Sequence, residues 1–333
     1  MKYDFITVGG ATRDISFFTD QGVLVDNKKD ILRQELLAFE YGAKIKVDKF
    51  HYYYGGGAAN SAVCLSRWGL KVASLLAVGD DEAGQLIKQN LKDQGVETKL
   101  IKTISAESSA ASFILIAPGG ERIIFGARGA NNKLKIESSD YRALRNSHNI
   151  YLASLSGAWQ RNLRQLFAAL DLDKTKVFWN PGGTQIRGGL SRLAPYLKKT
   201  TVLALNKDEA IELVLSSPEH HQLTHQQLNR VDRLLKIIHR FGPQLVMITL
   251  GEQGVTVFDG QTIYRRGPVK DSRRIDTTGI GDIFNSTFSA SYSQTGNIDK
   301  SLDLAMKNAA AKVRRLGAQK GLLKGNLKNR KKV

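Results

Sequence analysis

The sequence is poor in cysteine and proline and has no long apolar run, and each scarcity excludes a class of protein. Its single cysteine, Cys64, cannot form a disulfide within the chain, which excludes a disulfide-stabilised scaffold and favours a cytoplasmic protein. Because Cys64 lies among apolar residues, we expect a buried structural thiol and not a nucleophile. No proline- or serine-rich linker divides the chain. No stretch of about 18 apolar residues occurs, so no membrane span is expected. Asp4 interrupts the apolar N-terminal segment, in which a signal peptide would be uniformly apolar, so a secreted protein is not expected.

Acidic residues are also scarce. The chain has 49 Lys and Arg against 31 Asp and Glu, a net charge of +18. Many of the basic residues follow Lys312, a stretch that contains no acid, and we expect residues 322–333 to form a basic, mobile tail. No nucleic-acid recognition motif accompanies the charge, so nucleic-acid binding is not expected. The positive field is better suited to attracting small anionic ligands.

Apolar strand-like runs alternate with amphipathic segments along most of the chain. VASLLAVGD (72–80) shows almost no alternation, as in a strand that is covered on both faces. EAGQLIKQNLKDQGV (82–96) has helical periodicity and ends at a glycine. This pattern predicts an α/β domain with a mostly parallel sheet. Further helices are predicted over residues 60–70, 229–242 and 299–317.

Two regions break the alternation. Residues 15–54 show no convincing helix–strand pattern, although the segment before Gly55 resembles a strand. Residues 110–131 resemble a β-hairpin, with two β-rich runs joined through Pro118-Gly119-Gly120. Together the two regions predict a small sheet that projects from the main domain.

The segment Asp276-Thr-Thr-Gly-Ile-Gly-Asp282 precedes an apolar-periodic run. Its glycines allow a tight turn and a close approach to a ligand, and a helix that begins here presents unpaired amides and the positive end of its dipole. That arrangement suits a phosphoryl group, and Asp282 could accept a proton from an attacking hydroxyl. On spacing alone an ordinary helix cap is the favoured interpretation. Neither a P-loop motif nor a G-x-G-x-x-G fingerprint after the first strand is present.

Five segments in order resemble the ribokinase-like sugar kinases, also called the PfkB family. They are Gly55–Asn60 before a helix, Gly79-Asp-Asp-x-x-Gly84, Asn206-Lys-Asp-Glu209, Thr249–Gly254 and Asp276–Asp282. The resemblance extends from about residue 4 to 321. Each segment alone is weak evidence for this family, but five segments in the family's order outweigh the interpretation of Asp276–Asp282 as an ordinary helix cap. The resemblance implies a three-layer α/β/α ribokinase-like fold with a mostly parallel central sheet and a small β lid.

The resemblance also implies a domain organisation. Residues 1–14, 55–109 and 129–321 would form the α/β core that binds nucleotide and substrate. Residues 15–54 and 110–128 would form the lid, which excludes water from the reacting phosphoryl group. Because lid edges can pair between subunits, a homodimer through the lid is an option.

The implied activity is ATP-dependent phosphorylation of a sugar hydroxyl. Asp282 would be the general base, and the backbone amides of Gly279, Ile280 and Gly281 would form the anion hole. Glu209 would help to place Mg²⁺ through water, since a hard cation requires oxygen ligands. The remaining implied nucleotide-binding residues are Asn206, which also helps to place the metal, Thr249, Gly251, Gly254, Thr278 and Asn308. The implied substrate-binding residues are Asp14, Gly56, Gly57, Asn60 and Asn131.

Some positions depart from the family pattern, so the acceptor stays open. Ile280 stands where the family usually has alanine, and Gly57 where ribokinases tend to have lysine, which places ribose specificity in doubt. The long segment 15–44 and the tyrosines Tyr52, Tyr53 and Tyr54 leave a nucleoside kinase of the same fold as an alternative. A non-catalytic nucleotide-binding regulator is the least favoured alternative, because Asp282, both glycines and Glu209 are intact.

Overall fold

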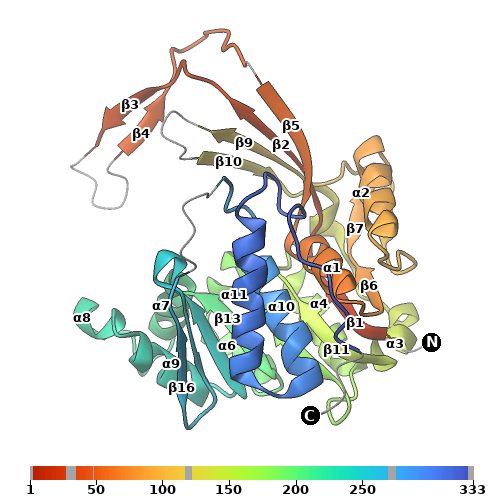
Figure 1. The fold of residues 1–333 in the computed structure, drawn as a ribbon, viewed down its shortest axis with the longest axis vertical. Helices are drawn as coiled ribbons and strands as arrows, with labels where there is room; N and C mark the ends of the chain where they lie inside the picture. Colours follow the sequence, from red (N-terminus) through yellow and green to blue (C-terminus); the bar gives the residue numbers. More distant parts are fainter. Residues whose placement is uncertain (1–2, 28–34, 48, 117–121, 269–274, 329–333) are drawn as a thin grey trace.

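The computed structural model describes residues 3–27, 35–47, 49–116, 122–268 and 275–328. Figure 1 shows an α/β body beneath a smaller sheet, with helices on both sides of the larger sheet. The turn predicted at Pro118–Gly120 and the end of the expected tail, 329–333, lie outside the described residues.

The central sheet has the strand order β16-β15-β14-β13-β12-β11-β1-β6. Every pair from β14 through β6 is parallel, whereas β14–β15 and β15–β16 are antiparallel. The mostly parallel sheet predicted from the sequence is therefore confirmed. The strands are β1 (Tyr3–Val8), β6 (Val72–Leu75), β11 (Ser147–Leu152), β12 (Lys176–Trp179), β13 (Val202–Asn206), β14 (Leu245–Thr249), β15 (Val255–Phe258) and β16 (Ile263–Arg266).

Both faces of this sheet are covered by helices, which accounts for its nearly continuous apolar strands. One face, with Phe5 and Met247, packs against α1 (Gly57–Arg67), α2 (Glu82–Asp93), α10 (Ile280–Thr295) and α11 (Ile298–Lys312). The other face, with Ile6 and Val246, packs against α3 (Ser138–Arg145), α4 (Trp159–Ala169), α6 (Leu190–Leu197), α7 (Lys207–Leu215) and α9 (Val231–Arg240). The predicted three-layer α/β/α fold is confirmed. The short elements are α5 (Gly183–Ile186), α8 (His225–Leu228), η1 (Gly129–Lys133) and η2 (Gly251–Gln253).

The smaller sheet has the order β10-β9-β2-β5 and lies over the body (Figure 1). Its antiparallel β9–β10 pair is the predicted hairpin. The parallel pairing of β2 with β9 was not predicted, because nothing in either segment specifies its partner. The strands of this smaller sheet, which we call the lid after the predicted role, are β2 (Thr12–Phe18), β5 (Lys49–Gly55), β9 (Ala111–Ile116) and β10 (Arg122–Ala127). In addition, β3 (Val23–Asp26) pairs with β4 (Glu35–Ala38), and β7 (Ala77–Gly79) with β8 (Lys102–Ile104).

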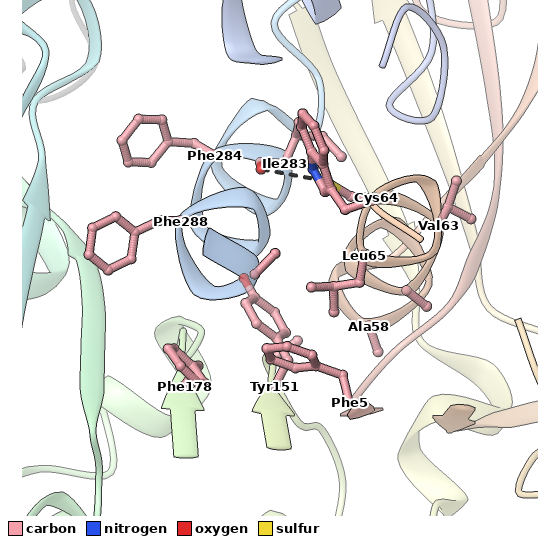
Figure 2. Packing of buried hydrophobic residues seen from close by; sticks show 14 of the residues in the cluster. Phe5, Ala58, Val63, Cys64, Leu65, Tyr151, Phe178, Ile283, Phe284 and Phe288 are labelled. Atoms are coloured by element: carbon pink, nitrogen blue, oxygen red, sulfur yellow. Dashed lines mark hydrogen bonds between the residues drawn. The ribbon is translucent and has the colours of Figure 1, made fainter. Parts of the chain in front are cut away.

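The core beneath α10 contains Cys64 (Figure 2). Cys64 is fully buried between α1 and α10, and its Sγ lies 3.2 Å from Thr287 Oγ1. Burial raises the pKa of this thiol, so it stays protonated and unreactive at neutral pH. The prediction of a structural thiol is confirmed.

The expected mobile tail is wrong for residues 322–328. Leu322 and Leu327 are buried in the core, and the amides of Gly325 and Leu327 donate to the carbonyl oxygens of Arg67 and Trp68 at 3.0 Å each. The segment contains two lysines and no acid, but two buried leucines five positions apart anchor it. Among the described residues, none of the helices is long and apolar enough to span a membrane.

Candidate active site

The loop before α10 has the geometry of an anion site. Gly279 takes a left-handed conformation with φ of 71° and caps the helix. A Cβ at Gly279 would lie 2.5 Å from Ala318 Cβ, so a larger residue would not fit. A Cβ at Gly281 would meet only open space, which leaves its backbone accessible to a ligand. The loop thus presents the positive end of a 16-residue helix to solvent-accessible space.

The three amides predicted for the anion hole are not equivalent. The Ile280 amide donates to Thr277 O at 3.2 Å and is therefore used within the loop. The amides of Gly279 and Gly281 have no acceptor among the described residues. In this structure the two glycine amides are therefore the accessible donors, and the role of Ile280 in the anion hole stays a prediction.

Asp282 lies in the first turn of α10, and its half-buried carboxylate is held from α1. Asn60 Nδ2 donates to Asp282 Oδ2 at 2.9 Å. Burial raises the pKa of Asp282, the Asn60 hydrogen bond partly opposes that rise, and the charge of Asp14 adds to it. A Cβ at Gly57 would lie 3.3 Å from Asp282 Oδ1, so the glycine keeps space beside the carboxylate open. A raised pKa suits a carboxylate that must accept a proton near neutral pH.

A cavity of about 390 Å³ lies between the lid and the loop. Asp14 on β2 and Thr278 in the loop both line it. Asp14 is only 6 % exposed, and Thr12 Oγ1 donates to its Oδ1 at 2.7 Å. Burial raises the pKa of Asp14, and hydrogen bonds from Thr12 and Ser112 oppose that effect. We call this the lid cavity.

A second cavity of about 390 Å³ lies on the other side of the loop. We call it the strand-end cavity, because residues that follow β14 line it. Thr249, Gly251 and Gly254, all predicted to bind nucleotide, are among them. Thr277 lines both cavities, so the loop is the wall that they share. Asp282 is part of neither lining; it directly follows Gly281, which lines the strand-end cavity, and the charge of Asp14, which lines the lid cavity, raises its pKa.

Asn308, predicted to bind nucleotide, is not among the residues that line the strand-end cavity. Its side chain is fully buried, donates from Nδ2 to Thr287 Oγ1 at 2.8 Å, and accepts from the Leu323 amide at 2.8 Å. Its neighbour Ala309 lines the cavity instead. Asn308 therefore holds the C-terminal segment against α10.

Three predicted substrate residues support the loops around the lid cavity. Asn131 uses both ends of its amide on the backbone of Ala11, at 3.2 and 3.0 Å. Gly56 has φ of 90°, and a Cβ there would lie 2.5 Å from Gly10 O. Asn60 Oδ1 accepts from Gln319 Nε2 at 3.1 Å in addition to the bond with Asp282. The structure therefore brings Asn60 to the carboxylate, while Gly56 and Asn131 brace the turn that precedes Asp14.

Asn206 and Glu209 form a capping box at the start of α7. Glu209 N donates to Asn206 Oδ1 at 2.8 Å, and Asn206 N donates to Glu209 Oε2 at 3.0 Å. Burial raises the pKa of Glu209, and the nearby Glu212 and Asp208 contribute to the rise while the Asn206 backbone opposes it. Asn206 also lines a hollow shared with Thr249 and Gly251. In the described part of the chain, no group of three or more His, Cys, Asp or Glu is arranged to hold a metal.

The sequence interpretation missed Thr277 and Lys312. Thr277 belongs to the quoted motif, but only the fold shows that it borders both cavities. Lys312 was considered only as the start of the acid-free basic stretch, yet its side chain is fully buried. A lysine at the end of a helical run carries no sequence signal for burial.

Comparison with known proteins agrees with this geometry. The model of the pfkB family of carbohydrate kinases matches residues 27–324. The ribokinase of Haemophilus influenzae is 28% identical over 288 residues, which cover 84% of this chain and 88% of that protein. The structure of Arabidopsis thaliana ribokinase complexed with ribose and ATP superposes with a TM-score of 0.78 at 20% identity, covering 98% of this chain and 97% of that one. The Methanocaldococcus jannaschii nucleoside kinase gives a TM-score of 0.72 at 21% identity, with coverage of 97% and 95%.

Proposed function

The chain belongs to the pfkB family of carbohydrate kinases and is an ATP-dependent kinase, and on this premise we propose that it phosphorylates a hydroxyl of a small, uncharged sugar. The observation that carries the proposal is the position of Thr277. This residue lines both cavities, so an acceptor in the lid cavity and a nucleotide in the strand-end cavity would meet across one loop. Catalysis of phosphoryl transfer depends almost entirely on positioning the two reactants and on stabilising the charge of the transferring group.

The loop and α10 would supply the chemistry. Asp282 takes the proton of the acceptor hydroxyl, whose oxygen then forms the new bond to the γ-phosphorus as the bond to the bridging oxygen of ADP breaks. The amides of Gly279 and Gly281, with the helix dipole behind them, would stabilise the charge on the transferring group. Asn60 would orient the carboxylate through its 2.9 Å hydrogen bond.

Glu209 is the residue we propose for Mg²⁺, with Asn206 beside it. Mg²⁺ keeps several waters and binds through one or two carboxylates plus substrate phosphates, so the absence of a three-carboxylate cluster in the described residues does not conflict with it. Oε2 of Glu209 accepts a hydrogen bond from the Asn206 amide, and Oε1 has no hydrogen bond to a described residue. When bound, the ion would neutralise charge on the phosphates.

The walls of the lid cavity favour an acceptor without a phosphate of its own. Asp14 lines it, the charge of Asp276 in the same lining is paired with Lys312, and no lysine, arginine or histidine is among its described lining residues. A carboxylate suits vicinal hydroxyls as an acceptor of their hydrogen bonds, but it repels a phosphate. We therefore propose that neutral sugars are phosphorylated in preference to sugar phosphates.

A nucleoside is the second candidate acceptor, and the apolar part of the same wall favours it. Phe18, Ile114, Ile116 and Leu316 line the cavity, and so does Tyr53. A free pentose has little apolar surface to pack against these side chains, whereas a nucleobase has an aromatic face that can do so. Tyr52 and Tyr54 lie on the opposite face of the lid, where both rings stack on the Arg13 guanidinium, with its Cζ 4.9 and 4.5 Å from the ring centroids.

We also propose a homodimer through the lid. Asp14, Ser16 and Phe18 line the lid cavity, so Ile15 and Phe17 face away from it. The register places Phe50, Tyr52, Phe113 and Phe125 on that same outer face, where they are 59%, 54%, 43% and 57% exposed. An exposed aromatic surface of this kind is typical of an interface.

An acceptor panel tests the proposal. ADP release would be measured with ATP and Mg²⁺ and each of the following: pentoses, hexoses, sugar acids, sugar phosphates and nucleosides. We expect stimulation by a neutral sugar, or by a nucleoside if the apolar wall decides specificity. Stimulation by sugar phosphates alone would contradict the proposed acceptor class, and no stimulation by any acceptor would remove the proposal altogether.

A further inference from the structure

Lys312 is a lysine without exposed surface. It is the last residue of α11, and its side chain is 0% exposed. Its Nζ donates to the backbone oxygen of Asp276 at 2.8 Å and to the carboxylate Oδ2 of Asp276 at 3.1 Å. Removing an ammonium group from water costs several kcal/mol, as an order of magnitude, unless oxygen partners compensate. Both of these partners belong to Asp276, the first residue of the segment Asp276–Asp282 at the start of α10.

Asp276 connects this ammonium to the rest of the loop. Its Oδ1 accepts from the Thr278 amide at 2.8 Å, and its Oδ2 accepts from the Gly317 amide at 2.8 Å. Burial alone would raise the pKa of Asp276, but the hydrogen bond with Thr278 and the positive charge of Lys312 outweigh it, and the pKa is lowered. The side chain is therefore an ionised carboxylate at neutral pH, and the pair is a buried ion pair.

The turn after Lys312 is packed directly beneath the loop. The Ile275 amide donates to Val313 O at 2.8 Å, and the Cβ that Gly279 lacks would lie 2.5 Å from Ala318 Cβ. Val313 lines the strand-end cavity, and Gly317 and Ala318 line the lid cavity. Lys312 lines neither cavity, so it can influence the reacting groups only through the loop.

We propose that Lys312 is a positioning residue for phosphoryl transfer. Its ammonium fixes the carbonyl and carboxylate of Asp276, and with them the turn that carries the Gly279 and Gly281 amides. It also cancels the charge of a carboxylate that would otherwise repel the migrating phosphoryl group. The inference rests on the proposed function, and it differs from a purely structural role because it predicts a loss of kcat in protein that is fully folded.

Lys312→Met, which removes the charge and keeps the length, is the first test. Because displacement of a catalytic group by about 1 Å can cost about 10²-fold, we expect kcat to fall by about that factor, with KM for ATP and acceptor little changed. Lys307→Met is the matched control, since Lys307 is exposed on the same helix. Unchanged kcat in folded Lys312→Met protein would overturn the inference.

Chemical rescue separates positioning from stability. Lys312→Ala leaves room for a small ammonium ion, so methylammonium should restore part of kcat, whereas tetramethylammonium, which cannot donate a hydrogen bond, should not. A loss of activity that follows only the unfolded fraction and ignores methylammonium would overturn the inference in favour of a structural role.

A double variant covers the case in which the single variants do not fold. Asp276→Asn/Lys312→Met removes both charges, so no uncompensated ion is left buried. We expect this variant to fold and to have a kcat below that of the wild type, because the hydrogen bond from Lys312 to the backbone oxygen of Asp276 is lost. Wild-type kcat in this variant would overturn the inference. A failure of the proposed function is distinguishable, because the wild-type protein itself would then show no acceptor-stimulated ADP release.

Discussion

The side-chain amide of Asn60, on α1, donates to the carboxylate of Asp282, on α10, across 2.9 Å between Nδ2 and Oδ2. The two residues are 222 positions apart, and the bond joins the N-terminal and C-terminal halves of the α/β body. Asn60 is itself held by Gln319, whose Nε2 donates to its Oδ1 at 3.1 Å. The protonation of Asp282 therefore depends on a residue that the sequence interpretation assigned to the sugar.

Replacing Asn60 with leucine should move the acid limb of kcat/KM to higher pH. The hydrogen bond favours the carboxylate, so its loss raises the already raised pKa of Asp282. The carboxylate is the active form of a general base, and activity is lost as the pH falls through that pKa. A higher pKa therefore begins the loss at a higher pH. The measurement is kcat/KM against pH for both proteins.

Gln319→Leu is the matched control for this experiment. It removes the other partner of Asn60 and leaves the bond to Asp282 in place, so its acid limb should stay close to that of the wild type. Equal limbs in Asn60→Leu and wild type would show that Asn60 does not set the titration of Asp282.

Asp282→Asn should reduce kcat by about 10²–10⁴-fold, the usual contribution of a general base. The substitution is nearly isosteric, so the affinity for ATP measured by calorimetry should change little. Asp171→Asn serves as the control, because Asp171 makes a surface ion pair with Lys174 at 2.7 Å. Near-normal turnover in Asp282→Asn would remove the carboxylate from the proposed role.

The sequence predicted the α/β architecture because buried strands and amphipathic helices have different apolar periods. On spacing alone an ordinary helix cap was favoured for the α10 loop, and the five segments in register reversed that interpretation; Gly279 does adopt a positive φ. Neither signal depends on long-range packing.

Packing decides the features that sequence missed. Asn308 and Lys312 both appear as polar positions on α11, and only the fold shows them fully buried. Leu327 stands among lysines, and its burial depends on Trp68, which is distant in the chain. The role of Asn60 could not be separated from that of a sugar ligand, because an amide suits both a hydroxyl and a carboxylate.

Leu327→Ala should lower the free energy of unfolding by about 2–5 kcal/mol, the usual cost of truncating a buried leucine. Leu327 is 2% exposed, whereas Leu323 in the same segment is 36% exposed. Leu323→Ala should therefore cost clearly less, although both substitutions remove the same atoms. Chemical denaturation of the two variants provides the measurement, and equal stabilities would mean that the segment is not docked in solution.

Phe113→Asp should convert a dimer into a monomer. Phe113 lies in the centre of the outer lid face, paired in register with Ile15 on β2 and Phe125 on β10, and all three face away from the lid cavity. A carboxylate buried without a partner at the centre of an apolar interface strongly opposes association. Light scattering coupled to size exclusion would give the mass of the wild type and the variant. Leu172→Asp introduces the same charge at a residue of similar exposure, 36% against 43%, on the helical body, and it should leave the dimer intact. A wild-type protein that is monomeric at micromolar concentration would contradict the proposed dimer.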